Sequence, residues 1–127
     1  MDPIAQAAAG TQASQSDWTA LKASAGAGEL FFEPAAAEEC AKACEDAIGK
    51  IDDHLREVRR LTFVDGFGSP NEGRQLAGKF RAKADEAYFV LHAHQKVLAD
   101  MRDTYRAAGK AYVDADAGNS GKFGCVG

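Results

Sequence analysis

Residues 64–72, read Val-Asp-Gly-Phe-Gly-Ser-Pro-Asn-Glu, decide the fold, because they end one helical pattern and begin another. The two glycines of this stretch can adopt the positive φ angles that terminate a helix, and its proline cannot continue a preceding helix. The Ser-Pro-Asn-Glu half has the features of a capping box, with serine as the N-cap and proline at the first helical position. We therefore predict a short elbow between two helices, and its central residues are Gly66, Phe67 and Gly68.

Apolar residues recur every three or four positions on both sides of this elbow. The first helix is predicted over about 34–64, with Pro34 in its first turn and a seam formed by Ala41, Cys44, Ile48, Ile51, Leu55, Val58 and Thr62. The second helix is predicted over about 70–114, with a seam formed by Phe80, Ala84, Ala87, Leu91, His94, Leu98, Met101, Tyr105, Ala108 and Tyr112. Two long helices joined by a short elbow must return antiparallel, so the predicted fold is an all-α helical hairpin.

The segment before the hairpin, residues 1–28, is dominated by Ala, Gly, Gln, Ser and Thr, a composition that buries little apolar surface. We expect it to be flexible or partly helical, with one short helix over about 16–25 that begins at N-cap residue types. The hairpin domain then covers 29–116, and 117–127 form a Gly-rich C-terminal tail.

The second helix is longer than the first, so its C-terminal part should extend past its neighbour. Counting back from the elbow places Pro34 opposite about Asp100, which leaves the apolar residues that follow uncovered. Val90, Ala93 and Val97 also widen the apolar face beyond what one antiparallel neighbour can bury. Either the N-terminal segment or a partner protein must cover this face, and dimerisation would complete a helical bundle. The predicted packing face consists of Val90, Val97, Met101, Tyr105, Tyr112 and Trp18.

Composition bounds the possible functions. A chain of 127 residues supports one domain. The net charge of -4 and a pI near 5.3 do not provide the basic surface that nucleic acids require, and they oppose binding to anionic membranes. The sequence contains no apolar run of the roughly 20 residues needed to cross a bilayer, so no membrane insertion is expected. The first residues lack the basic and apolar regions of a Sec-type signal peptide, so we expect none.

Metal-binding and catalytic patterns are not found in the sequence. Cys40, Cys44 and Cys125 make neither a Cys-X-X-Cys pair nor a zinc spacing. Cys40 and Cys44, four residues apart, are interpreted as small buried thiols on a packed helix face. The alternative is a bridge from Cys125 to one of them after export. His92 and His94 are two residues apart and would point away from each other on a helix. We therefore expect no metal, no cofactor and no enzymatic activity.

Tyr112 and Asp116 form a Tyr-X-X-X-acid pattern at the end of the second helix. Together with the hairpin and the Gly-Phe-Gly elbow, this pattern resembles the Trp-X-Gly family of type VII (ESX) secretion substrates, over about residues 33–116. The resemblance is to an actinobacterial subgroup in which Gly-Phe-Gly stands where Trp-X-Gly is usual. The chain departs from the usual pattern because its only tryptophan is Trp18, far upstream of the elbow.

The resemblance implies export without a signal peptide, from the cytoplasm to the outside of the cell or to the cell envelope. Tyr112 and Asp116 would be the secretion signal recognised by a secretion ATPase. The chain would be an export substrate or the targeting partner of a larger effector, as a homodimer or as a heterodimer with another helical hairpin or with the effector. Two alternatives remain, namely a cytoplasmic helical adaptor or oligomerisation module without an export role, and a metal-binding or redox bundle.

Overall fold

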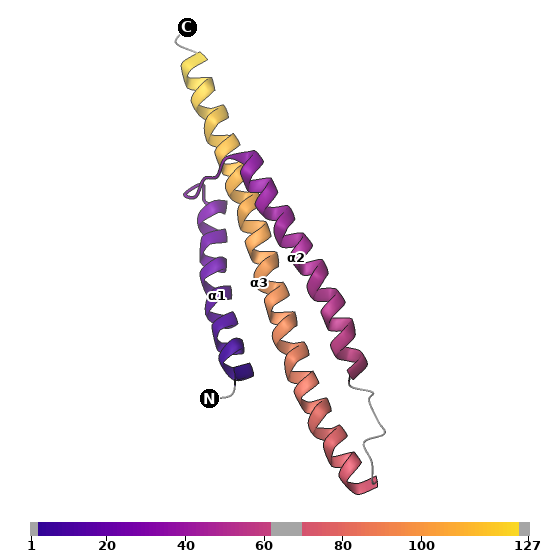
Figure 1. Ribbon diagram of the computed structural model, residues 1–127. Helices are drawn as coiled ribbons and strands as arrows, with labels where there is room; N and C mark the ends of the chain where they lie inside the picture. The colour runs from indigo at the N-terminus through magenta and orange to yellow at the C-terminus, as the bar shows by residue number, and fades with distance from the viewer. Residues whose placement is uncertain (1–2, 62–69, 125–127) are drawn as a thin grey trace.

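The computed structural model describes residues 3–61 and 70–124, and within them the chain forms three α-helices and no strand (Figure 1). These are α1 (Pro3–Gly26), α2 (Pro34–Leu61) and α3 (Pro70–Gly124). The predicted all-α class is confirmed. The predicted elbow, Gly66, Phe67 and Gly68, lies outside the described residues, as does Thr62 of the first seam.

The central element is α3, which has 55 residues and is therefore about 83 Å long. α2 lies along one side of it and α1 along the other (Figure 1). α2 runs opposite to α3, since Arg59 contacts Tyr88 whereas Glu38 pairs with Arg106. Within the part of the chain that the structure describes, α1 and α2 have no close backbone approach. The three helices therefore form an open layer with α3 in the middle.

The start of α2 is capped by Glu33. Its carboxylate accepts hydrogen bonds from the backbone N–H of Ala35 at 3.1 Å and of Ala36 at 2.8 Å. These two N–H groups hold the pKa of Glu33 below its usual value, because they stabilise the charged form. The capping carboxylate also complements the positive, N-terminal end of the helix dipole, and Arg59 and Arg60 in the last turn complement its negative end.

The predicted seam of α2 faces α3. Ala41, Cys44 and Leu55 are buried, and the seam isoleucines and valine between and beyond them are half-buried. Burial raises the pKa of the Cys44 thiol, as expected for a thiol in apolar surroundings. The periodicity in the sequence therefore identified the packed face of this helix correctly.

The register between α2 and α3 differs from the prediction. Pro34 lies beside Gly109 rather than Asp100, since a Cβ atom added to Gly109 would sit 3.7 Å from the Cα of Pro34. The N–H of Phe32 also donates to the carbonyl of Ala108 at 3.2 Å. The first turns of α3 extend past the end of α2 (Figure 1), so pairing begins later along α3 than a tight elbow would give. The part of α3 that continues past the start of α2 consequently begins near Gly109 rather than near Asp100.

Two helices are longer than predicted. α1 begins at Pro3 rather than near residue 16, and α3 continues to Gly124 rather than ending near 114. Most of the Gly-rich segment 117–127 is therefore helical. The extension of α1 contains many alanines, the residue with the highest intrinsic helix propensity, whereas that of α3 contains several glycines, which favour a helix least among residues other than proline. No helix within the described ranges combines the length and the apolar character that crossing a membrane requires.

The protein is expected to lose stability at alkaline pH. Burial raises the pKa of Cys44 and of the Tyr105 phenol, and the nearby Cys40 raises both further. Above the ordinary thiol and phenol values, roughly pH 8.5 and 10, the unfolded chain releases these protons while the folded chain still holds them. The free energy of unfolding should therefore fall as the pH rises through this range.

Urea unfolding of the reduced protein at pH 8 to 11 would measure this decline. A double variant, Cys44→Ala with Tyr105→Phe, should show a flatter profile than the wild type. Equal slopes in the two proteins would mean that other groups cause the alkaline destabilisation.

Candidate recognition surface at the C-terminal end of α3

Tyr112 and Asp116 both lie inside α3, and both side chains are exposed, that of Tyr112 to 43%. Residues four apart on an α-helix lie on the same face, one turn above the other. The sequence placed this pair at the frayed end of the second helix, but the helix continues beyond it to Gly124. The helix therefore fixes the spacing between the aromatic ring and the carboxylate.

This part of α3 begins to project from the three-helix layer. Figure 1 shows α3 continuing past the start of α2 and the end of α1. Val113, next to Tyr112, is 50% exposed, and Asp114 adds a second exposed carboxylate. The projecting end thus presents an aromatic ring, an aliphatic side chain and acidic groups on a helical support.

A groove of about 540 Å³ lies at the base of this projection, where the end of α1 and the connection to α2 meet α3. Gly28 has a φ of 77°, a conformation that favours glycine, and turns the chain there. The N–H of Glu29 donates to the carbonyl of Ser24 and that of Gly28 to Ala25, which is a Schellman cap. The groove is lined by Ala25, Gly26, Gly28, Phe31, Ala107, Lys110, Ala111, Asp114 and Ala115.

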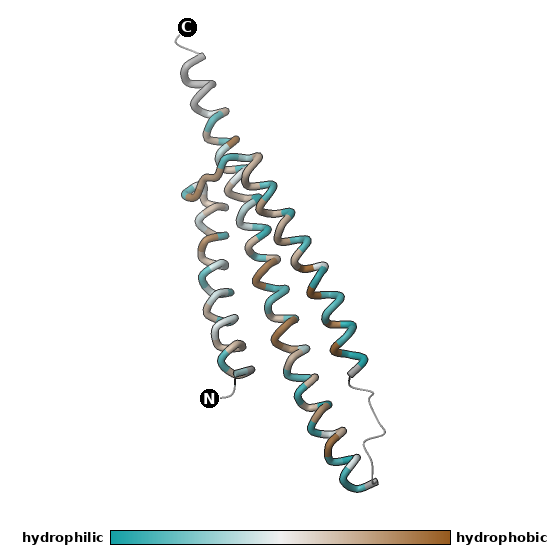
Figure 2. Tube along the Cα trace, viewed as in Figure 1, coloured by the Kyte–Doolittle hydropathy of each residue, from teal (hydrophilic) through white to brown (hydrophobic). Residues whose placement is uncertain are grey.

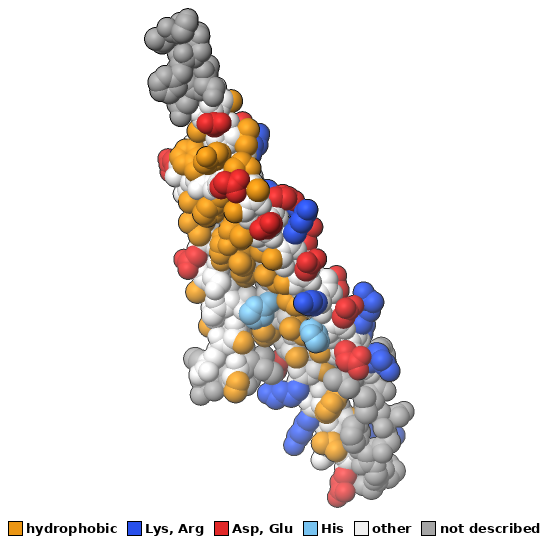
Figure 3. Space-filling model, turned by 45° about the horizontal axis from the view of Figure 1, so that its top comes forward, with side chains coloured by type: hydrophobic (Ala, Val, Ile, Leu, Met, Phe, Trp, Pro, Cys, Tyr) orange, Lys and Arg blue, Asp and Glu red, His pale blue; other side chains and the backbone are white. Residues whose placement is uncertain are grey.

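Tyr105, two turns before Tyr112, is packed between two aromatic rings. Its ring centroid is 5.7 Å from that of Trp18 on α1 and 5.6 Å from that of Phe32 in the connection. Both ring pairs are tilted, a favourable geometry for aromatic contacts. Hydrophobic side chains gather over the end of the layer near the projection (Figure 3).

The structure separates the six residues of the predicted packing face into groups. Trp18 and Tyr105 contact each other, Val97 is buried, and Val90 and Met101 are half-buried. Tyr112 is not covered in this way. The N-terminal segment therefore covers the Tyr105 part of the face and leaves Tyr112 exposed.

Two contacts between α1 and α3 involve buried threonines, which lie outside the predicted apolar seams. Thr104 is fully buried, and its hydroxyl lies 3.5 Å from the carbonyl of Trp18 on α1. Thr11 is also buried, with its hydroxyl 3.2 Å from Nε2 of His94. His94 belongs to the predicted apolar seam of α3, but its side chain is exposed.

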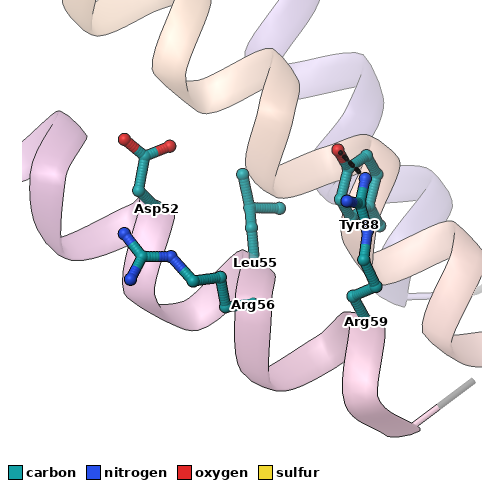
Figure 4. Close-up of a pocket in the computed structure, with 5 residues that line it drawn as sticks. All are labelled: Asp52, Leu55, Arg56, Arg59 and Tyr88. Atoms are coloured by element: carbon teal, nitrogen blue, oxygen red, sulfur yellow. Dashed lines mark hydrogen bonds between the residues drawn. The ribbon is translucent and has the colours of Figure 1, made fainter.

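A smaller hollow of about 190 Å³ between α2 and α3 is lined by Asp52, Leu55, Arg56, Arg59 and Tyr88 (Figure 4). The Arg59 guanidinium donates to the Tyr88 hydroxyl at 3.1 Å and lies 5.3 Å from the centre of the Tyr88 ring. Both interactions hold α2 against α3. The hollow is therefore part of the helix contact, and its residues do not form a nucleophile with an adjacent base.

Cys40 is exposed and Cys44 is buried, and neither forms a disulfide within the described residues. Cys125 lies outside the described residues, so the predicted alternative bridge to it is not addressed by the structure. Among residues 3–61 and 70–124, no three His, Cys, Asp or Glu side chains gather as a metal site would require.

Comparison of the chain with protein-family models, with curated proteins and with solved structures finds no match. Function is therefore inferred from the residues and the geometry of this chain. The projecting end of α3 is the surface that best fits a recognition role.

Proposed function

We propose that this chain is a type VII (ESX-like) secreted protein, exported as a substrate or as the targeting partner of a larger effector. The secretion signal is the pair Tyr112 and Asp116. The observation that carries the proposal is the exposure of both side chains on one face of α3, one turn apart, where that helix leaves the layer. In this role the protein would act by recognition and would not catalyse a reaction.

A helical segment with an aromatic ring and a carboxylate on one face suits a receptor groove. Helix-in-groove recognition uses side chains at such spacings as anchors. Tyrosine is among the residues that most often dominate binding energy at interfaces. A secretion ATPase would bind the Tyr112 ring in a pocket and pair the Asp116 carboxylate with a cationic group.

The rest of the fold supports this role by holding α3 in place. α1 and α2 pack along α3 on either side, so the signal is carried on a helix that is already ordered before binding. Prior ordering reduces the entropy lost on association. The protein would be recognised folded in the cytoplasm and then released outside the cell or into the cell envelope.

A partner chain is part of the proposal. α2 and α3 would act as the helical hairpin that pairs with another hairpin or with an effector, as a homodimer or a heterodimer. Exposed apolar side chains on α3, Leu76 at 49% and Phe89 at 65%, support such a contact. The same exposure favours the second candidate, a cytoplasmic helical adaptor or oligomerisation module without an export role.

Export of the wild type and of Tyr112→Ala and Asp116→Ala, in a host with an active type VII system, would test the proposal. Each variant should lower the amount in the medium by about tenfold or more, the effect of losing an interfacial anchor worth ~1.4 kcal/mol. The quantity in cells and in medium would be measured by immunoblotting. A host without the secretion ATPase should show no export of the wild type.

Val113→Ala is the matched control, because Val113 is exposed to a similar extent beside Tyr112 but lies about 100° away around the helix. It should be exported like the wild type. Unchanged export of both signal variants would exclude the assignment and favour the adaptor.

A further inference from the structure

The packing of α1 onto α3 differs in kind from that of α2. α2 shows a clear apolar seam, whereas α1 consists largely of Ala, Gln, Ser and Thr and shows little contrast along its length (Figure 2). Trp18 and Leu21 are its large apolar residues apart from Ile4, and Leu21 is exposed. Hydrophobic burial therefore provides little to hold α1 in place.

The surface of α3 beneath α1 is well buried all the same. Val97, Thr104 and Ala111 recur at intervals of seven, so they share one face of α3, and all three are buried. Thr104 lies 3.5 Å from the carbonyl of Trp18, and Ala111 lines the same groove as Ala25. Removing α1 would uncover this face.

The hydrogen bonds between α1 and α3 each have a local substitute. The Thr11 hydroxyl has a single proton, which it donates to the carbonyl of Ala7 at 2.7 Å, so His94 Nε2 must donate in the 3.2 Å contact between them. His94 is exposed, so water can replace Thr11 as its partner. The Thr104 hydroxyl donates to the carbonyl of Asp100 within α3. Separation of the two helices therefore leaves no buried hydrogen-bonding group without a partner.

The ion pairs across this contact are also weak. Lys22 lies 3.5 Å from Asp103 and 3.9 Å from Asp100, with about half of the lysine side chain exposed. Exposed pairs of this kind contribute little to stability. If α1 separates, Asp103 keeps its ion pair with Arg102, which lies 3.1 Å away on the same helix.

The connectivity allows α1 to leave without disturbing the remaining helices. α1 has no close backbone approach to α2 within the described residues, and its only covalent link to them is the connection 27–33. α2 keeps its own contacts with α3, including the pairing of Arg106 with Glu38 and Glu45.

We infer that α1 is a detachable strap, a helix that separates from α3 as a unit while α2 and α3 remain packed. Its separation exposes the face of α3 that carries Val97, Thr104 and Ala111. The contacts of Trp18 with Tyr105 and of Thr11 with His94 are the points where the strap is held. This device is independent of the export proposal and does not require a partner.

Hydrogen exchange of the full-length protein, followed by mass spectrometry or NMR, tests the strap. Amides of 11–25 should exchange about 100-fold faster than the most protected amides of α2 and α3, through an opening with a smaller denaturant dependence than global unfolding. Equal protection and equal denaturant dependence in all three helices would overturn the inference.

Trp18→Ala gives a second, independent measurement. It should speed exchange in α1 by about tenfold or more while leaving protection at 41–55 in α2 unchanged, because only α1 loses a holding contact. Leu21→Ala, which shortens an exposed residue of the same helix, should leave both unchanged. Loss of protection in α1 and α2 together for Trp18→Ala would show that the three helices open as one unit.

Discussion

Replacement of Gly109 by leucine is expected to lower the free energy of unfolding by about 2 kcal/mol, the net of two opposing effects. Even a single Cβ atom at this position would lie 3.1 Å from the Cβ of Ala37 and 3.7 Å from the Cα of Pro34. Overpacking of such a contact typically costs up to about 3 kcal/mol. Leucine has a higher helix propensity than glycine, which offsets about 1 kcal/mol of this cost. The close crossing of α2 over α3 therefore depends on a residue without a side chain.

Gly78 provides the matched control, because it lies in the interior of the same helix with no atom within 4 Å of an added Cβ. Gly78→Leu should raise the free energy of unfolding by roughly 0.5 to 1 kcal/mol, so the two variants should differ by about 3 kcal/mol. Urea unfolding followed by circular dichroism measures both. Similar stability of the two variants would contradict the close crossing at Gly109.

The features that could be predicted from the sequence are those that depend only on residues close together in the chain. Apolar residues every three or four positions gave α2 and its buried face, including Ala41, Cys44 and Leu55. The same periodicity placed Tyr112 and Asp116 on one face of a helix, because that relation needs only 3.6 residues per turn. A longer helix did not alter it.

The remaining features depend on contacts between distant residues. The register of α2 on α3 is set by the close approach of Pro34 and Ala37 to Gly109, which no periodicity encodes. α1 has no apolar stripe, so its sequence predicted only a short helix near Trp18. The face of α3 beneath it includes Thr104, a buried polar residue whose hydroxyl is satisfied by its own helix. Such a position is visible only once the helices are placed.

Tyr105→Ala is expected to destabilise the protein by about 3 kcal/mol, at the lower end of the range for truncation of a packed aromatic residue. Its ring contacts Trp18 on α1 and Phe32 in the connection, so one side chain on α3 holds both segments. Each aromatic pair adds roughly 0.5 to 1.5 kcal/mol beyond the area that it buries. Trp18 is the only tryptophan, so its fluorescence reports directly on the loss of this cluster, and its emission should shift to longer wavelength.

Tyr112→Ala removes the same side chain from the same helix, two turns further on, where it is 43% exposed. Its unfolding free energy should stay within about 0.5 kcal/mol of the wild type, and its Trp18 emission should not move. Tyr105→Phe, which keeps the ring, should resemble the wild type in both measurements. If Tyr112→Ala instead destabilises the protein as much as Tyr105→Ala, then Tyr112 is a packing residue and loss of export in that variant would reflect misfolding. Stable folding without export is the combination that only a recognition role for Tyr112 explains.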